Sequence, residues 1–298
     1  MPTAEYDRLY EKLQSLPPVF GRDIKASRAE MEKAAAKFFP VSDEVTCQPV
    51  DANGVSAEWV TPKEDVGEGV ILMLHGGGYC IGSIASYRNV AGNLARIAKR
   101  KTLLIEYRLS PEHPFPAALD DAATAYNWLL DQGVKPNHIT IVGDSAGGNL
   151  TLTTLLRLRE DDVALPAVAV AISPWTDLTG SGESARTRVE EDPLIKPDRT
   201  NYIAEWYHRY TDIKHPLVSP LFADLTGLPP LLIQVGTRET LLDDSTRFAE
   251  AARNHGVEVD LQIWDDMFHV WHYYADWIPE GIQAFEQIAQ FIDSRIGS

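Results

Sequence analysis

Hydrophobic and polar residues follow two rhythms along this chain, and these rhythms predict where strands and helices lie. The continuous apolar run Val70-Ile71-Leu72-Met73-Leu74 is typical of a strand buried on both faces of a sheet. Further strand-like runs lie near residues 102–107, 139–143, 167–172, 230–235 and 257–263. Helical spacing of apolar residues predicts helices near residues 86–100, 117–131, 146–160, 241–255 and 280–294. This alternation predicts an α/β fold, with a mostly parallel central sheet and helices on both faces.

The two edges of the sheet have their own signals. Strands near residues 44–50 and 55–61 flank Asn53-Gly54, a dipeptide that favours a tight hairpin, so we expect antiparallel edge strands. Residues 257–263 alternate between apolar and polar, as expected of the opposite edge. That edge could pair across a two-fold axis, so a homodimer is one expected assembly.

Three further helices fall outside the alternation. Residues 3–16 form an amphipathic pattern that Pro17-Pro18 should stop, and Ser27-Arg28-Ala29-Glu30 has the form of a capping box for a second helix. More than fifty residues separate the strand ending near Ser173 from the strand starting near Pro230, and a helix with an aromatic face is expected there, from Asp198 to Tyr210. From the pattern alone, these helices could cover a site or only a face of the sheet.

Composition narrows the class of protein. The chain has 298 residues, of which 44% are hydrophobic, and it carries a net charge of -16, which disfavours nucleic acid or an anionic membrane as a partner. Cys47 and Cys80 lie far apart and have no metal-ligand spacing, which fits a reducing compartment. The N-terminus lacks the pattern of a secretory signal, and no stretch is long enough to span a bilayer. We therefore expect a cytoplasmic protein without stable membrane association.

The segment Gly143-Asp144-Ser145-Ala146-Gly147 joins an apolar strand to an apolar helix. Its Gly-x-Ser-x-Gly frame permits a turn tight enough to hold the serine clear of the backbone, which is the geometry of a nucleophile elbow. The same pattern also occurs in ordinary glycine-rich turns and in phosphate-binding loops. A serine nucleophile needs a base, a carboxylate and donors for an oxyanion, so the partners decide between these interpretations.

The remaining chemistry lies at the ends of other strands. His75-Gly76-Gly77-Gly78-Tyr79 follows a strand and could supply backbone donors, although a flexible surface loop would have the same composition. His269 and His272 follow the last strand and are the candidate bases, with His269 preferred for its apolar frame. In the loop after residues 230–235, Glu239 lies nearest the strand end, whereas Asp243 and Asp244 could simply cap the following helix.

Taken together, these motifs resemble the hormone-sensitive-lipase-like, or bacterial family IV, carboxylesterases of the α/β-hydrolase superfamily. The resemblance rests on the glycine loop, the serine elbow through Asn149, and the segment Tyr107-Arg108-Leu109-Ser110-Pro111-Glu112 with Phe115-Pro116-Ala117-Ala118. One departure is clear. The family usually has Asp-Pro-Leu in the acid loop, and the aligned residues here are Glu239-Thr240-Leu241.

The resemblance implies an α/β-hydrolase fold with a helical cap. It implies N-terminal cap helices in residues 1–42, a catalytic core in residues 43–178 and 217–298, and an inserted cap segment in residues 179–216. It also implies a nucleophile at Ser145, a base at His269 and an oxyanion hole from the N–H groups of Gly77, Gly78 and Ala146. Glu239 is the preferred acid and Asp243 the reserve; no metal or organic cofactor is expected.

The expected activity is hydrolysis of short- to medium-chain carboxylic esters through an acyl-enzyme on Ser145. A lactone hydrolase would use the same triad, and the sequence does not separate the two substrates. A receptor for small molecules on the same scaffold is a third hypothesis. The presence of both His269 and a carboxylate disfavours the receptor, because such receptors can lose the histidine.

Overall fold

The computed structural model describes residues 2–16, 21, 23–64 and 66–296. Eight of the described segments form one sheet in the spatial order β1-β2-β4-β3-β5-β6-β7-β8. Their bounds are β1 Val45–Ala52, β2 Val55–Pro62, β3 Val70–Leu74, β4 Lys101–Ile105, β5 Ile139–Asp144, β6 Val168–Ile172, β7 Leu231–Gly236 and β8 Val259–Trp264.

The pairing of the strands confirms the mostly parallel sheet. β3 to β8 pair in parallel, whereas β1 and β2 form an antiparallel hairpin, and β2 runs antiparallel to β4. At the hairpin turn, Asn53 and Gly54 have φ angles of +55° and +90°, the left-handed conformation that Asn and Gly tolerate. β3 and β5 are buried along their whole length, while every position of β8 is half-buried or exposed, as expected for an edge. The burial of β8 does not follow its alternating sequence to the end, because Ile263 is 47% exposed.

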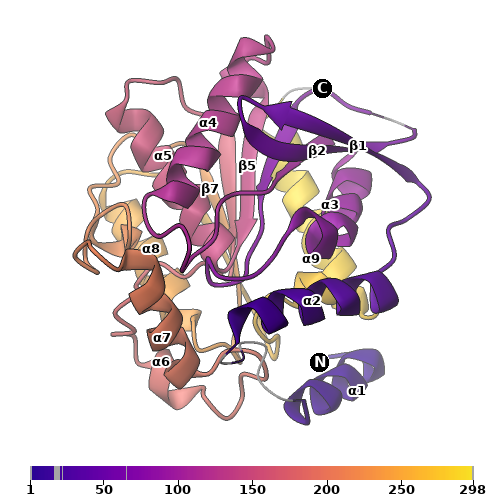
Figure 1. Ribbon diagram of the computed structural model, residues 1–298, viewed down its shortest axis with the longest axis vertical. Coiled ribbons are helices and arrows are strands. Elements are labelled where there is room, and N and C mark those ends of the chain that lie inside the picture. Colours follow the sequence, from indigo (N-terminus) through magenta and orange to yellow (C-terminus); the bar gives the residue numbers. More distant parts are fainter. Residues whose placement is uncertain (1, 17–20, 22, 65, 297–298) are drawn as a thin grey trace.

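Helices cover both faces of the sheet (Figure 1). One core packs side chains of α4, α5 and α8, including Leu129, Leu155 and Phe248, against the sheet, and a second core packs Leu94 of α3 and Phe285 of α9 against the opposite face. The five helices are α3 Ile84–Ala98, α4 Ala117–Asp131, α5 Ala146–Glu160, α8 Leu242–Asn254 and α9 Pro279–Asp293. These helices connect strands that run in the same direction, so the carboxyl ends of β3 to β8 all lie at one edge of the sheet.

Further helices lie beyond that edge in Figure 1. They are α1 Ala4–Gln14, α2 Ile24–Phe38, α6 Ser184–Thr187 and α7 Pro197–His208. Elsewhere in the described chain, short 3-10 helices are η1 Pro136–His138, η2 Pro220–Phe222 and η3 Trp271–Tyr274. The division into core and cap stays a prediction, but α6 and α7 do fall within residues 179–216. None of the described helices combines the length and the apolar composition that crossing a membrane requires.

The expected start of the second helix is wrong. α2 begins at Ile24, and its N-cap is Asp23, whose Oδ1 accepts hydrogen bonds from the N–H groups of Lys25 and Ala26. Ser27 lies inside the helix, where its hydroxyl donates back to the carbonyl of Asp23. An aspartate four residues upstream therefore satisfies the free amides before the capping box can act. The expected stop at Pro17-Pro18 lies outside the described residues.

Candidate active site

Ser145 lies at the junction of β5 and α5 with a strained backbone. Its φ and ψ angles are +55° and -117°, a backbone conformation that residues other than glycine rarely adopt. Its N–H donates to Ile172 O at the end of β6. The turn leaves no room for a side chain at Gly143, because a Cβ there would lie 2.2 Å from the carbonyl oxygen of Gly147. The turn thus has the geometry of a nucleophile elbow.

The elbow packs directly against the glycine loop that follows β3. A Cβ on Gly147 would lie 2.1 Å from Leu74 O, so only glycine lets α5 begin this close to the loop. Asp144 fixes the loop from the other side. Its Oδ1 accepts the Gly76 N–H at 2.9 Å, its Oδ2 accepts the Tyr87 hydroxyl at 2.8 Å, and burial raises its pKa to about 6.

Aromatic and amide side chains complete the support of this loop. The Tyr107 hydroxyl donates to His75 O at 2.6 Å, and the two rings stack with centroids 4.1 Å apart. Burial lowers the pKa of His75 to about 4, so this histidine is a neutral anchor at neutral pH. The Tyr79 hydroxyl donates to Oδ1 of Asn149, whose Nδ2 donates to Trp175 O. Tyr107 and Asn149 therefore support the loop from the two motifs that follow it in the chain.

The base and acid candidates meet between the ends of β7 and β8. His269 Nδ1 lies 2.9 Å from Glu239 Oε2, and both side chains are buried. A hydrogen bond from Nδ1–H to this carboxylate leaves Nε2 as the proton acceptor. Among the described residues, the buried Nε2 has no hydrogen-bond partner. One nitrogen is thus held in place while the other is available to a reacting group.

Ser173 is a residue that the sequence reasoning missed. Its hydroxyl donates to Glu239 Oε1 at 2.7 Å and accepts the Val270 N–H at 3.3 Å, so it joins the acid loop to the base loop. Ser173 and Val270 both have positive φ angles, of 45° and 51°, which is strained for a β-branched valine. The sequence does contain a signal for this role. Ser173 is a polar residue directly after the buried strand β6, and β6 lies between β5, which precedes Ser145, and β7, which precedes Glu239.

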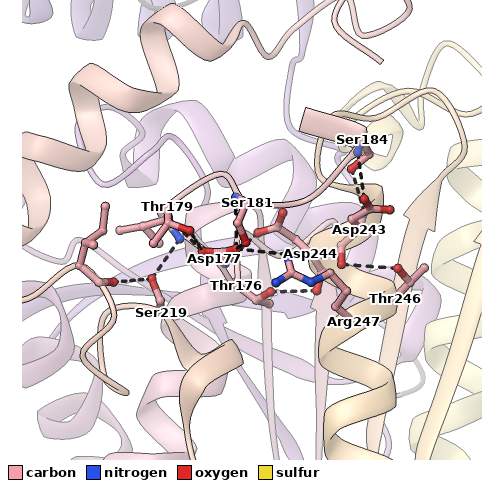
Figure 2. Close-up of polar contacts among 12 residues, drawn as sticks. Thr176, Asp177, Thr179, Ser181, Ser184, Ser219, Asp243, Asp244, Thr246 and Arg247 are labelled. Carbon is pink, nitrogen blue, oxygen red and sulfur yellow. Dashed lines mark hydrogen bonds and ion pairs between the residues drawn. The ribbon is translucent and has the colours of Figure 1, made fainter. Parts of the chain in front are cut away.

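The two reserve candidates lie elsewhere. His272 Nε2 contacts Gln234 Oε1 at 2.7 Å, and burial lowers the pKa of this histidine to about 3. Asp243 faces the start of α6, where its Oδ2 accepts the Ser184 N–H at 2.9 Å (Figure 2). Of the competing residues, the structure brings Glu239 and His269 together, and it pairs neither His272 nor Asp243 with them.

Burial and charge act in opposite directions on this pair. Burial raises the pKa of Glu239, although the hydrogen bond and charge of His269 partly offset the effect. Burial alone would lower the pKa of His269, but the hydrogen bond and the negative charge of Glu239 outweigh it, so this pKa lies above its usual value. The arrangement stabilises an imidazolium, which is the species that forms when a histidine accepts a proton from a nucleophile.

Similarity to known proteins agrees with this geometry. A family model described as the α/β-hydrolase fold matches residues 71–273. The chain belongs to the α/β-hydrolase family. Within that family, the chain is similar to an esterase from the bacterial hormone-sensitive lipase family, with 40% sequence identity. The crystal structure of that esterase superposes with a TM-score of 0.94, and the match covers 100% of both chains.

Two further relatives support the same branch of the α/β-hydrolases. An acetyl-hydrolase of Streptomyces hygroscopicus is 45% identical over 279 residues, which cover 92% of this chain and 91% of the relative. The crystal structure of EstE5 soaked by p-nitrophenyl butyrate is 44% identical, with a TM-score of 0.94 and coverage of 99% of this chain and 100% of EstE5. This hormone-sensitive-lipase-like α/β-hydrolase is a carboxylic ester hydrolase.

Proposed function

We propose that the chain is a serine carboxylesterase that hydrolyses short- to medium-chain esters through an acyl-enzyme on Ser145. Ser145 Oγ attacks the ester carbonyl while His269 Nε2 takes its proton, and Glu239 holds the imidazolium. The proton then passes from His269 to the departing alkoxide, which leaves as the alcohol. Water attacks the acyl-enzyme with the same base, which releases the carboxylic acid and restores the Ser145 hydroxyl.

The observation that carries this proposal is the buried Glu239–His269 pair beside a strained serine. His269 Nε2 is buried without a partner among the described residues, and Ser145 has a φ angle of +55°. The end of β6 links the two, because the Ser145 N–H donates to Ile172 O and the next residue, Ser173, donates to Glu239. A tight, strained turn that exposes the hydroxyl and an available imidazole nitrogen are two of the features that a serine nucleophile requires. A non-catalytic receptor would gain nothing from either feature.

The oxyanion hole is assigned to the N–H groups of Gly77, Gly78 and Ala146. Gly77 and Gly78 have φ angles of +114° and +61°, and a Cβ on Gly77 would lie 2.3 Å from Ile81 O. Ala146 is the first residue of α5, where backbone N–H groups are not used within the helix and favour negative charge. The contact of Gly147 with Leu74 O brings the two sets of donors to the same edge.

A small cavity lies between the inserted segment of residues 179–216 and the loop that follows Glu239. It has a volume of about 180 Å³, and its border combines Trp175, Ile195 and Leu241 with polar residues that include Asp177, Arg186 and Asn201. None of Ser145, Glu239 and His269 borders the cavity; it reaches them only through Trp175, whose N–H donates to Ser145 O, and through Thr240, which follows Glu239. Its volume is below that of typical pockets for drug-sized ligands. Ile195 lies in residues 179–216, which fits the proposed role of that segment as a cap.

The expected acyl-chain profile tests the substrate class. With p-nitrophenyl esters, kcat/KM should be highest for acetate to hexanoate and fall by about a hundredfold by dodecanoate, because each methylene that stays outside a pocket forgoes its burial. A panel of lactones measured beside these esters separates the two hydrolase hypotheses. Higher kcat/KM for a lactone than for every linear ester, or a maximum at dodecanoate, would reject the proposed substrate class.

The pH profile tests the base. His269 must be neutral to accept a proton, so kcat/KM for p-nitrophenyl butyrate should fall about tenfold per unit as the pH drops below its pKa. Because Glu239 raises that pKa, the midpoint should lie above 6.5. Circular dichroism over the same range checks that the protein stays folded. A plateau that extends below pH 6 would contradict the assignment of His269.

A further inference from the structure

Asp192 is a fully buried carboxylate that lies far from the acid loop in sequence and contacts it in space. Its Oδ2 accepts the N–H of Thr240 at 2.9 Å and the Thr240 hydroxyl at 3.2 Å. Thr240 directly follows Glu239, so the backbone of the proposed acid is held from the next peptide onward. A proline at position 240, which the resemblance would lead one to expect, could make neither hydrogen bond.

The other oxygen of Asp192 organises its own segment. Its Oδ1 accepts the N–H groups of Leu194 and Ile195, both at 2.9 Å, so the carboxylate receives four hydrogen bonds in all. Buried carboxylates are costly unless their oxygens are satisfied, and here two loops share that task. One loop belongs to residues 179–216, and the other carries Glu239.

A second contact between the same two segments reinforces the first. Ser184 Oγ donates to Thr240 O at 2.8 Å and accepts the Asp243 N–H at 2.9 Å, while Asp243 Oδ2 accepts the Ser184 N–H (Figure 2). The N–H and the C=O of Thr240 are therefore both bound by residues 184 and 192. The turn that presents Glu239 is fixed by the inserted segment as well as by β7.

The charge of Asp192 also reaches the base. The charged and titratable groups that act on the His269 imidazole are Glu239, through a direct hydrogen bond, and Asp192 and Asp144, through space. His272 is a neighbour as well, but it is neutral at ordinary pH because burial lowers its pKa to about 3. Asp192 thus adds negative charge on the side of the inserted segment, in a buried site where charges are poorly screened.

We propose that Asp192 is a positioning residue for the esterase reaction, which fixes the Glu239 loop through Thr240 and stabilises the His269 imidazolium through space. The inference rests on the proposed function. It makes residues 179–216 a contributor to the reaction itself, in addition to any covering of the substrate.

The decisive variant is Asp192→Asn, which keeps the size of the side chain and removes its charge. With p-nitrophenyl butyrate, kcat should fall about tenfold, because hydrogen bonds to a charged acceptor are worth more than those to a neutral one. KM should change less than twofold. The acid limb of kcat/KM should move to lower pH, because a negative charge that raised the pKa of His269 is gone.

Asp177 offers a matched control. This carboxylate is also fully buried and lies two residues before the inserted segment, where it accepts hydrogen bonds from Thr179, Ser181 and Arg247 (Figure 2). It is not among the groups whose charge acts on His269. Asp177→Asn should lower the Tm at least as much as Asp192→Asn and leave the acid limb in place.

The outcomes separate this inference from the proposed function. An acid limb that stays unchanged in Asp192→Asn, in an enzyme that still depends on Ser145, would overturn the role of Asp192 alone. Retained turnover in Ser145→Ala would overturn the proposed function and this inference with it. If Asp192→Asn does not fold, Thr240→Val provides the test, since it removes one hydrogen bond to Asp192 without changing charge. A kcat equal to wild type in Thr240→Val would reject the positioning role.

Discussion

Replacing Ser145 with alanine should lower kcat/KM for p-nitrophenyl butyrate by about 10⁵- to 10⁶-fold. The substitution deletes the hydroxyl that forms the acyl-enzyme, and no other step of the proposed reaction can replace it. The residual rate should come from the oxyanion donors and substrate binding alone. Stopped-flow or steady-state release of p-nitrophenolate measures the loss. Phenylmethylsulfonyl fluoride should add its sulfonyl group, with loss of HF, to the wild type and not to the variant.

Ser173→Ala is the control for a serine that supports the acid but is not the nucleophile. Ser173→Ala removes one hydrogen bond to Glu239 and leaves the nucleophile, so about a tenfold loss is expected. Alanine at position 145 also has to adopt the positive φ angle of +55°, so thermal unfolding should be recorded for both variants. Comparable losses in the two folded variants would show that Ser145 is not the nucleophile.

The second large effect is expected for Glu239→Gln, which should lower kcat/KM by about 10³- to 10⁴-fold. Glutamine can present its NH₂ group to His269 Nδ1, which favours the wrong tautomer, and it cannot stabilise the imidazolium. The loss of negative charge should also move the acid limb of the pH profile to lower pH, because the Glu239 charge raises the pKa of His269.

Asp243→Asn is the matched control for that variant. Asp243 contacts Ser184 rather than His269, so its neutral analogue should lose less than about tenfold in kcat/KM. A loss at position 243 that exceeds the loss at position 239 would transfer the role of acid to the reserve candidate. Asp244 is bound in a similar way to the N–H of Asp177 and should behave like Asp243.

Much of this architecture could be predicted from the chain itself, because the signals are local. The apolar run of β3 and the Asn53-Gly54 hairpin match the structure, since both are decided by residues within a few positions of each other. The order of strands also implies that Ser145, Glu239 and His269 share one edge of the sheet. The predicted start of α2 is wrong even though its signal is local. Asp23, four residues before Ser27, caps the helix, so the helix begins before the Ser27 capping box.

The rest depends on contacts between distant segments. Ser173 joins Glu239 to Val270 across 66 and 97 positions, and Asp192 reaches Thr240 across 48. No spacing within a single helix or strand encodes such pairs, and each residue read alone is an ordinary loop serine or aspartate. The choice between Asp243 and Glu239 was open for a related reason. Both lie in one short loop, and only its conformation decides which side chain turns towards His269.

The hydrogen bonds between Thr240 and Asp192 have a consequence for protein engineering. Chimeras that exchange the inserted segment of one esterase for that of another are a natural route to new substrate ranges. In this chain such an exchange would replace Asp192 but keep Thr240, which donates its N–H to Asp192. A foreign segment without an acceptor at position 192 would leave the Thr240 N–H buried without a hydrogen-bond partner. A recombination library should therefore inherit positions 192 and 240 from the same parent.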